Sequence, residues 1–227
     1  MVRVPLLIAT VLVACEKPAG PAASSFPSRF AVHGVDVSHH NGVIDWPTVA
    51  NAGVHFAWVK ATEGADVRDE RFRANATAAQ TAGLAAGPYH FFTFCRPGAE
   101  QAANFLESIR GVPRSLPPAV DVEFVGNCRT PPPPDDIRKQ LDRWLRDVEL
   151  ATGSQVVVYT TPDAAAQLLG GLDRRLWIRS IARAPTEPWT VWQFDASGRV
   201  PGIVGPVDLD VFSGDRAALE GLNGAAR

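Results

Sequence analysis

The strongest chemical signal in the sequence is a pair of carboxylates, Asp121 and Glu123, with one residue between them. They end a short apolar segment, 118–123, that is typical of a β-strand. Residues i and i+2 of a strand point to the same face, with Cα atoms about 6.6 Å apart. Burial and repulsion would keep one carboxyl protonated near neutral pH while the other stays ionised. Such a pair suits acid/base hydrolysis of glycosides. The alternative is two structural acids, one paired with an arginine and one solvated.

Polar and aromatic residues also stand at the ends of other predicted strands. In barrels built from strand–helix units, the active site lies at the carboxyl ends of the strands. We therefore expect these residues to gather with Asp121 and Glu123 around one cavity. They are Asp36, Glu63, Tyr89, His90, Tyr159, Trp192, Gln193, Asp208 and Asp210.

Hydrophobic periodicity predicts five strand–helix units followed by three strands without helices. The strands are expected at 32–37, 55–60, 84–92, 118–123, 155–159, 176–181, 190–194 and 207–212. The helices are expected at 45–53, 69–82, 98–110, 135–153 and 162–169. This order predicts an α/β fold with a parallel sheet, closed as a trimmed TIM-like (β/α) barrel of eight strands. An open doubly wound sheet is the alternative, but no Gly-rich phosphate loop follows the first strand.

The N-terminus has the features of an export signal. Residues 1–14 carry one charge, Arg3, and an apolar run that is too short to cross a bilayer. The run ends in Leu12-Val13-Ala14-Cys15, which resembles a bacterial lipobox with Cys15 as the lipidated residue. The resemblance to Gram-negative lipoproteins implies that Glu16 after the cysteine slightly favours sorting to the outer membrane. Secretion without a lipid, and an uncleaved core segment, are the alternatives.

These features divide the chain into four parts. We expect a lipoprotein signal peptide at 1–14, a lipidated cysteine with a flexible Pro/Ala/Ser spacer at 15–29, a catalytic barrel at 30–220 and a tail at 221–227. The expected location is the bacterial envelope, in the periplasm and lipid-anchored to a membrane.

Export also bears on the other two cysteines, Cys95 and Cys128. In an oxidising compartment two remaining thiols usually form a disulfide. Two separate buried thiols are the alternative. Neither cysteine has the spacing of a zinc ligand.

Charge and length exclude other classes. The chain has 227 residues, with 22 Lys plus Arg against 24 Asp plus Glu. This length suits one domain, and the missing basic excess argues against binding of nucleic acid. His39 and His40 are adjacent, and side chains of adjacent strand residues point in opposite directions. We therefore expect no metal site, and we expect no cofactor.

Seven short motifs, taken in order along the chain, resemble those of the glycoside hydrolase family 25 lysozymes, also called Chalaropsis-type muramidases. They are G-V-D-V-S-H-H-N-G at 34–42, V-K-A-T-E-G at 59–64, G-P-Y-H-F-F at 87–92, P-P-A-V-D-V-E at 117–123, V-V-V-Y-T at 156–160, W-Q-F at 192–194 and V-D-L-D-V-F at 207–212. The resemblance implies a β/α barrel with five regular units and three trailing strands. It also implies an enzyme that cleaves the β-1,4 bond between N-acetylmuramic acid and N-acetylglucosamine in peptidoglycan, and we expect this enzyme to be a monomer.

The resemblance also implies roles for individual residues. Glu123 matches the general acid, and Asp121 matches its carboxylate partner on the strand. Asp36 and Asp208 match the other two acidic positions of the site. The expected substrate-binding residues are Tyr89, His90, Tyr159, Trp192, Gln193 and Glu63. For Glu63 a structural role, as the partner of Lys60 or as a buried acid near the barrel axis, is slightly favoured. The family often has Asn at the position of Asp210.

Two other functions remain open. A barrel that binds peptidoglycan without cutting it is disfavoured, because a degenerate copy should have lost at least one of the four acidic positions. A hydrolase acting on a different glycan is the other possibility, since loop lengths set sugar choice. Arg174, Arg179 and Arg183 are candidates for binding an anionic glycan, or else they are solvated surface charges.

Overall fold

The computed structural model describes residues 26–181 and 183–223. The expected signal peptide and Cys15 lie outside the described residues. Packing extends somewhat beyond the expected 30–220 domain. Phe26 stacks on His33 with ring centroids 4.5 Å apart, and Leu222, in the expected tail, is buried.

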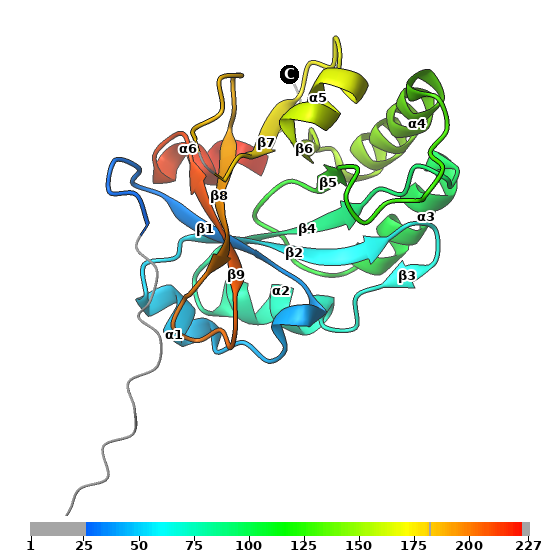
Figure 1. Cartoon of the computed structure of the whole chain (residues 1–227). Helices are drawn as coiled ribbons and strands as arrows, with labels where there is room; N and C mark the ends of the chain where they lie inside the picture. The colour runs from blue at the N-terminus through cyan, green and yellow to red at the C-terminus, as the bar shows by residue number, and fades with distance from the viewer. Residues whose placement is uncertain (1–25, 182, 224–227) are drawn as a thin grey trace, which may run out of the picture.

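Eight strands form a closed barrel, as predicted (Figure 1). The first strand, β1, pairs with both β2 and β9, and these contacts close the sheet. A two-residue strand, β3 (Val67–Arg68), pairs only with β2 and was not predicted. The barrel strands are β1 (His33–Val37), β2 (Phe56–Glu63), β4 (Ala85–Phe91), β5 (Ala119–Val122), β6 (Val157–Thr160), β7 (Arg175–Arg179), β8 (Val191–Gly198) and β9 (Val207–Phe212).

Five helices lie outside the barrel and follow its first five strands (Figure 1). The longest, α4, begins with a proline in its first turn and ends at Gly153, whose φ of 66° is the left-handed conformation that glycine adopts readily. Its apolar side chains recur at helical spacing and are buried against the sheet. The helices are α1 (Trp46–Asn51), α2 (Phe72–Thr81), α3 (Gly98–Ile109), α4 (Pro134–Thr152) and α5 (Pro162–Leu168).

The end of the barrel departs from the expected parallel sheet. Strand β9 runs antiparallel to both of its neighbours, β8 and β1. An antiparallel partner can follow directly through a hairpin, whereas a parallel one needs a crossover. The short connection 199–206 can therefore join β8 to β9 without a helix.

The structure has two apolar cores, and neither fills the end of the barrel where the site lies. The larger core lies between the sheet and the helices. A second core fills the barrel interior, where Trp58 stacks on Trp177 with ring centroids 4.9 Å apart. Leu219 of α6 (Arg216–Glu220) and Leu222 belong to this second core, together with residues from the starts of the strands. Polar residues of the interior are thus confined to one end of the barrel, which holds the carboxyl ends of the seven parallel strands and the start of the antiparallel β9. Within the described residues, no helix is long and apolar enough to cross a membrane.

Candidate active site

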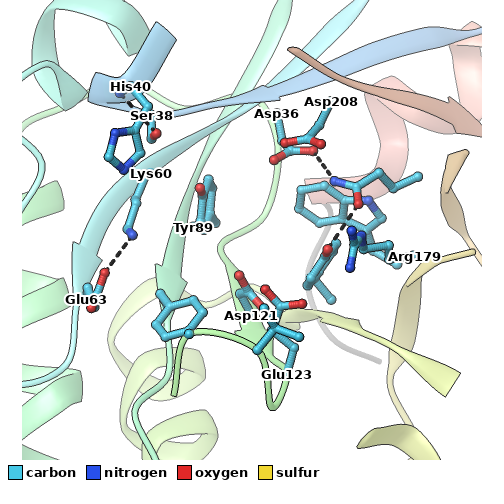
Figure 2. Close-up of a pocket in the computed structure, with 16 residues that line it drawn as sticks. Asp36, Ser38, His40, Lys60, Glu63, Tyr89, Asp121, Glu123, Arg179 and Asp208 are labelled. Atoms are coloured by element: carbon cyan, nitrogen blue, oxygen red, sulfur yellow. Dashed lines mark hydrogen bonds and ion pairs between the residues drawn. The ribbon is translucent and has the colours of Figure 1, made fainter. Parts of the chain in front are cut away.

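A cavity of about 430 Å³ opens at the carboxyl ends of the barrel strands (Figure 2). Eight of the catalytic and substrate-binding residues expected from the sequence line it. They are Asp36, Glu63, Tyr89, Asp121, Glu123, Tyr159, Gln193 and Asp208. Ser38, His40, Lys60, Trp177 and Arg179 are among the further lining residues.

Asp121 and Glu123 stand side by side in this cavity (Figure 2). Asp121 belongs to β5 and is 9% exposed, whereas Glu123 follows the strand and is half-buried. Burial raises the pKa of Asp121 well above its usual value, and repulsion from Glu123 raises it further. Burial also raises the pKa of Glu123, against the opposing effect of the Arg179 guanidinium. The pair therefore retains a proton at pH values where an ordinary carboxyl would be ionised.

A second group of acids faces this pair from β1 and β9. Asp36 and Asp208 are register partners in the β1–β9 ladder. Burial, and then repulsion from Asp208 and Asp210, raises the pKa of Asp36 well above its usual value. The pKa of Asp208 is raised to about 6, chiefly by burial.

Gln193 connects this acidic group to the aromatic wall. Its Nε2–H donates to Asp36 Oδ2 over 2.7 Å, and its Oε1 accepts the hydroxyl of Tyr159 over 3.0 Å. The Tyr159 ring meets Trp177 edge-on with centroids 4.8 Å apart. Trp177 was not named from the sequence, although it lies two residues before Arg179 and so shares the inner face of β7.

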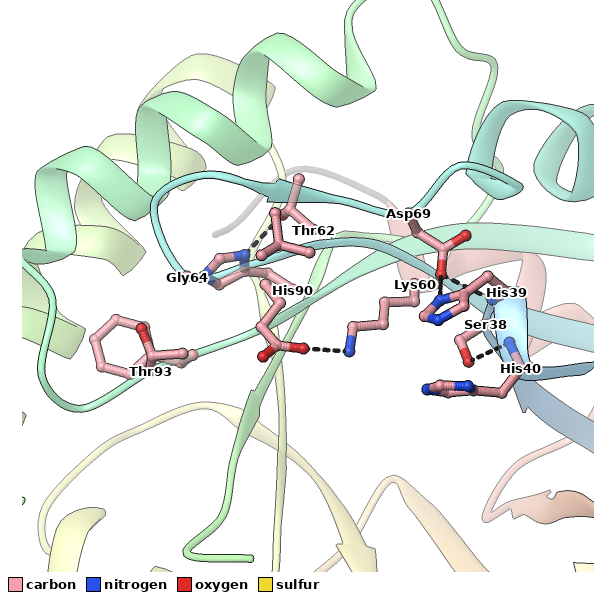
Figure 3. Close-up of polar contacts among 12 residues, drawn as sticks. Ser38, His39, His40, Lys60, Thr62, Gly64, Asp69, His90 and Thr93 are labelled. Carbon is pink, nitrogen blue, oxygen red and sulfur yellow. Dashed lines mark hydrogen bonds and ion pairs between the residues drawn. The ribbon is translucent and has the colours of Figure 1, made fainter. Parts of the chain in front are cut away.

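Two cations lie among these acids. Lys60 Nζ contacts Glu63 Oε2 at 2.8 Å (Figures 2 and 3), so Glu63 is the partner of Lys60 as well as a lining residue. Arg179 projects from the end of β7 toward Glu123 (Figure 2) and has no hydrogen bond or ion pair to any residue in the described part of the chain. Of the other two arginines considered, Arg174 pairs with Glu149 at 2.8 Å and Arg183 is exposed, and neither lines the cavity.

The structure corrects the expectation for His90. Its neighbour Tyr89 faces the barrel interior, so His90 faces outward, and it is fully buried. Thr62 Oγ1 donates to His90 Nδ1 over 2.7 Å (Figure 3), and the imidazole stacks on Trp144. Burial lowers the pKa of His90 to about 3. A neutral histidine without exposed surface supports the helix layer and does not contact a substrate.

Trp192 is corrected for the same reason. Gln193 faces inward, so Trp192 faces outward and does not line the cavity. Its Nε1–H donates to the carbonyl of Ser180 over 2.8 Å, and its ring packs edge-on against Phe30. Trp192 thus packs on the outside of the barrel against Phe30, which precedes the first strand.

Cys95 and Cys128 form a disulfide, as expected. The bond joins the loop after β4 to the loop after β5, directly beyond Glu123. Asn127 in the second loop reinforces this link, because its Nδ2–H groups donate to the carbonyls of Glu123 and Phe92 over 3.0 and 2.9 Å. The backbone next to Glu123 is thus attached to the neighbouring rim.

His39 and His40 belong to a short 3-10 turn, from which His40 lines the cavity. His39 Nδ1 contacts Asp69 Oδ2 at 2.9 Å, and Ser38 Oγ accepts the backbone N–H of His40 (Figure 3). The two histidines therefore have hydrogen-bonding roles in this turn.

Comparison with known proteins places this geometry in context. The family model of the glycosyl hydrolases family 25 matches residues 35–203. Lysozyme M1 of Streptomyces globisporus is 36% identical over 91% of this chain and 74% of its own length. The structure of a family 25 glycosyl hydrolase from Bacillus anthracis superposes with a TM-score of 0.82, at 31% identity over 90% of this chain and 99% of that one. A bacterial lysozyme from Streptomyces coelicolor gives a TM-score of 0.76, at 33% identity over 85% and 97% of the two chains.

A closed (β/α) barrel with an adjacent pair of buried carboxyls in its cavity has the residues that glycoside hydrolysis uses, and the family match shows that the protein is a glycoside hydrolase. The chain belongs to glycosyl hydrolases family 25.

Proposed function

We propose that the protein is a lysozyme, a 1,4-β-N-acetylmuramidase. Its substrate is the β-1,4 bond between N-acetylmuramic acid and N-acetylglucosamine in bacterial peptidoglycan. The single observation that carries the proposal is the adjacent pair Asp121 and Glu123, buried in a cavity in which a carboxyl holds its proton. The relatives named lysozymes support the choice of glycan.

Glu123 is the general acid that protonates the leaving oxygen. It is the more exposed member of the pair and lies at the mouth of the cavity, where a glycosidic oxygen can reach it. Its raised pKa keeps the proton available. After the sugar has left, the same carboxylate takes a proton from the attacking water.

Asp121 acts on the substrate's own acetamide. Its Oδ1 is buried and accepts no hydrogen bond from any described residue, so it is an acceptor available for an N–H. An acetamide N–H directed at this oxygen would point its carbonyl oxygen at the anomeric carbon. That oxygen attacks as the leaving group departs, water then opens the ring formed, and configuration is retained.

The remaining cavity residues bind and polarise the sugar. Asp36 and Asp208 stabilise positive charge that develops near the anomeric carbon. Tyr89 and Tyr159 provide aromatic surface for the sugar rings, while Gln193 and Glu63 offer polar contacts at opposite sides of the cavity.

The enzyme is proposed to work as a monomer in the bacterial envelope, held by a lipid on Cys15 with the following spacer as its tether. A Cys15→Ser variant should then leave the membrane fraction. A variant that remains membrane-bound would contradict the anchor.

A barrel that binds peptidoglycan without cutting it is the second candidate. The gathering of all four acidic side chains in one cavity favours the enzyme. The test is digestion of purified peptidoglycan by residues 26–227 and by Glu123→Gln, with mass spectrometry of the fragments. Fragments with muramic acid at the reducing end, from the wild type alone, are expected. No fragments from either protein, with both sedimenting with the wall, would support the binding module.

A further inference from the structure

One carboxyl of the acidic group lies beneath the cavity. Asp210 does not line the cavity and has no exposed surface, although it faces the barrel interior two residues after Asp208. Its Oδ1 accepts the indole N–H of Trp177 over 2.7 Å. Its Oδ2 is buried and accepts no hydrogen bond from any residue that the structure describes.

Asp36 and Asp210 are diagonal neighbours on the inner face of the β1–β9 ladder, and each carboxyl acts on the pKa of the other. Two neighbouring carboxyls in a low-dielectric interior retain one proton between them, because two carboxylates would repel each other. The groups acting on Asp210 are Asp36 on β1, Asp208 on its own strand and the Trp177 N–H on β7, and none of them is a cation. Its register neighbours, Gly34 and Gln193, add no charge.

The surroundings of the two carboxyls decide which one holds the proton. Asp36 reaches the cavity wall, where water has access, and it also accepts the Gln193 amide over 2.7 Å. An ionised Asp210, which has no exposed surface, would have the indole N–H as its one donor among the described residues. An ionised carboxylate therefore costs less free energy at Asp36 than at Asp210. The shared proton resides on Oδ2 of Asp210, which has no other partner among the described residues.

We propose that Asp210 is a positioning residue that remains a neutral carboxylic acid at working pH, donating a hydrogen bond to Asp36 and accepting one from Trp177. It acts through these two residues, one acidic and one aromatic, which both line the cavity. Its role in hydrolysis rests on the proposed function, whereas its protonation state can be measured without any activity.

The test uses two substitutions of Asp210. In Asp210→Asn the amide oxygen can still accept the Trp177 N–H, and the amide N–H can still donate to Asp36, so kcat and its pH profile should stay close to wild type. Asp210→Leu can do neither, and kcat should fall by about tenfold or more, as expected for loss of a hydrogen bond to a charged group. Asp208→Asn, the same substitution two residues away in the cavity, should lose activity.

The outcomes are distinguishable. Asp210→Asn as impaired as Asp210→Leu, with both folded by circular dichroism, would overturn the proposal, because it would mean that the ionised carboxylate is required. The infrared spectrum at neutral pH gives a second readout. The carbonyl band of a protonated carboxylic acid should be present in the wild type and diminished in Asp210→Asn. An unchanged band would also overturn the proposal. A wild type that cuts no peptidoglycan would instead refute the proposed function and leave the infrared result standing.

Discussion

Asp36 and Asp208 face each other at the same register position of the antiparallel β1–β9 ladder, so the first and last strands of the barrel bring two acids to the same corner of the cavity. Like charges directly opposite one another destabilise a sheet. Burial and then repulsion from Asp208 raise the pKa of Asp36, and burial raises the pKa of Asp208, so placing the two acids here lowers the stability of the fold.

Asp208→Asn should stabilise the fold at neutral pH. The pKa of Asp208 is about 6 in the folded state and about 3.9 in an unfolded chain. Between these values the folded state binds more protons, so the free energy of unfolding falls as pH rises from about 4 to about 6. The variant lacks this loss and should gain on the order of 2 kcal/mol at pH 7. Urea unfolding at pH 4 and pH 7 measures it, with the exposed Asp142→Asn as the matched control. An equal loss of stability in wild type and Asp208→Asn would contradict the account.

The rate of hydrolysis should decline on the alkaline side as Glu123 loses its proton. Burial raises the pKa of Glu123, so the acid form persists to a higher pH than in a solvated glutamate. A profile of kcat/KM against pH for soluble peptidoglycan fragments reports this pKa. A rate that stays constant well into the alkaline range would show that no acid with a carboxyl pKa takes part.

Arg179→Ala should move that alkaline limb to higher pH. The guanidinium favours the carboxylate form of Glu123 and so lowers its pKa, and its removal should raise the pKa further. Arg179→Lys keeps the charge and should leave the limb nearer its wild-type position. If the alanine and lysine variants shift the limb equally, the effect does not come from charge.

The disulfide should stabilise the rim that carries Glu123. Cys95 and Cys128 are 33 residues apart, and closing a loop of that size contributes about 3.7 kcal/mol in the chain-entropy model. The double Cys→Ser variant should unfold at lower temperature and bind substrate more weakly, because Glu123 precedes the linked loop. Equal melting temperature and equal KM for the variant and wild type would count against this role.

The alternation of side chains along each strand predicts most of the site and also explains why two expected residues, His90 and Trp192, are not in it. Because alternate residues share a face, Asp121 and Glu123 could be placed together, and Tyr159 and Gln193 reach the same cavity. By the same rule, an inward-facing Tyr89 places the side chain of His90 on the outer face of the strand. The family motifs include both inward-facing and outward-facing residues, whereas only alternate residues of a strand face the interior.

Other features could not be read from the sequence. The antiparallel direction of β9 depends on which edge closes the barrel, and hydrophobic patterns do not report direction. The two-residue strand β3 is too short to show any period. The contact of Asp210 with Trp177 joins strands that are not neighbours in the sheet, so it follows only from the closed interior.

The most direct test of the central claim is the leaving-group dependence of Glu123→Gln. A sugar leaving group needs protonation, so cleavage of peptidoglycan by this variant should slow by about 10²–10⁴-fold. An aryl glycoside of the same sugar releases a stable aryl anion, so its first-turnover release should slow far less. Asp121→Asn should be impaired with both substrates. If Glu123→Gln loses the same factor on both substrates, or cuts peptidoglycan normally, Glu123 does not protonate the leaving oxygen.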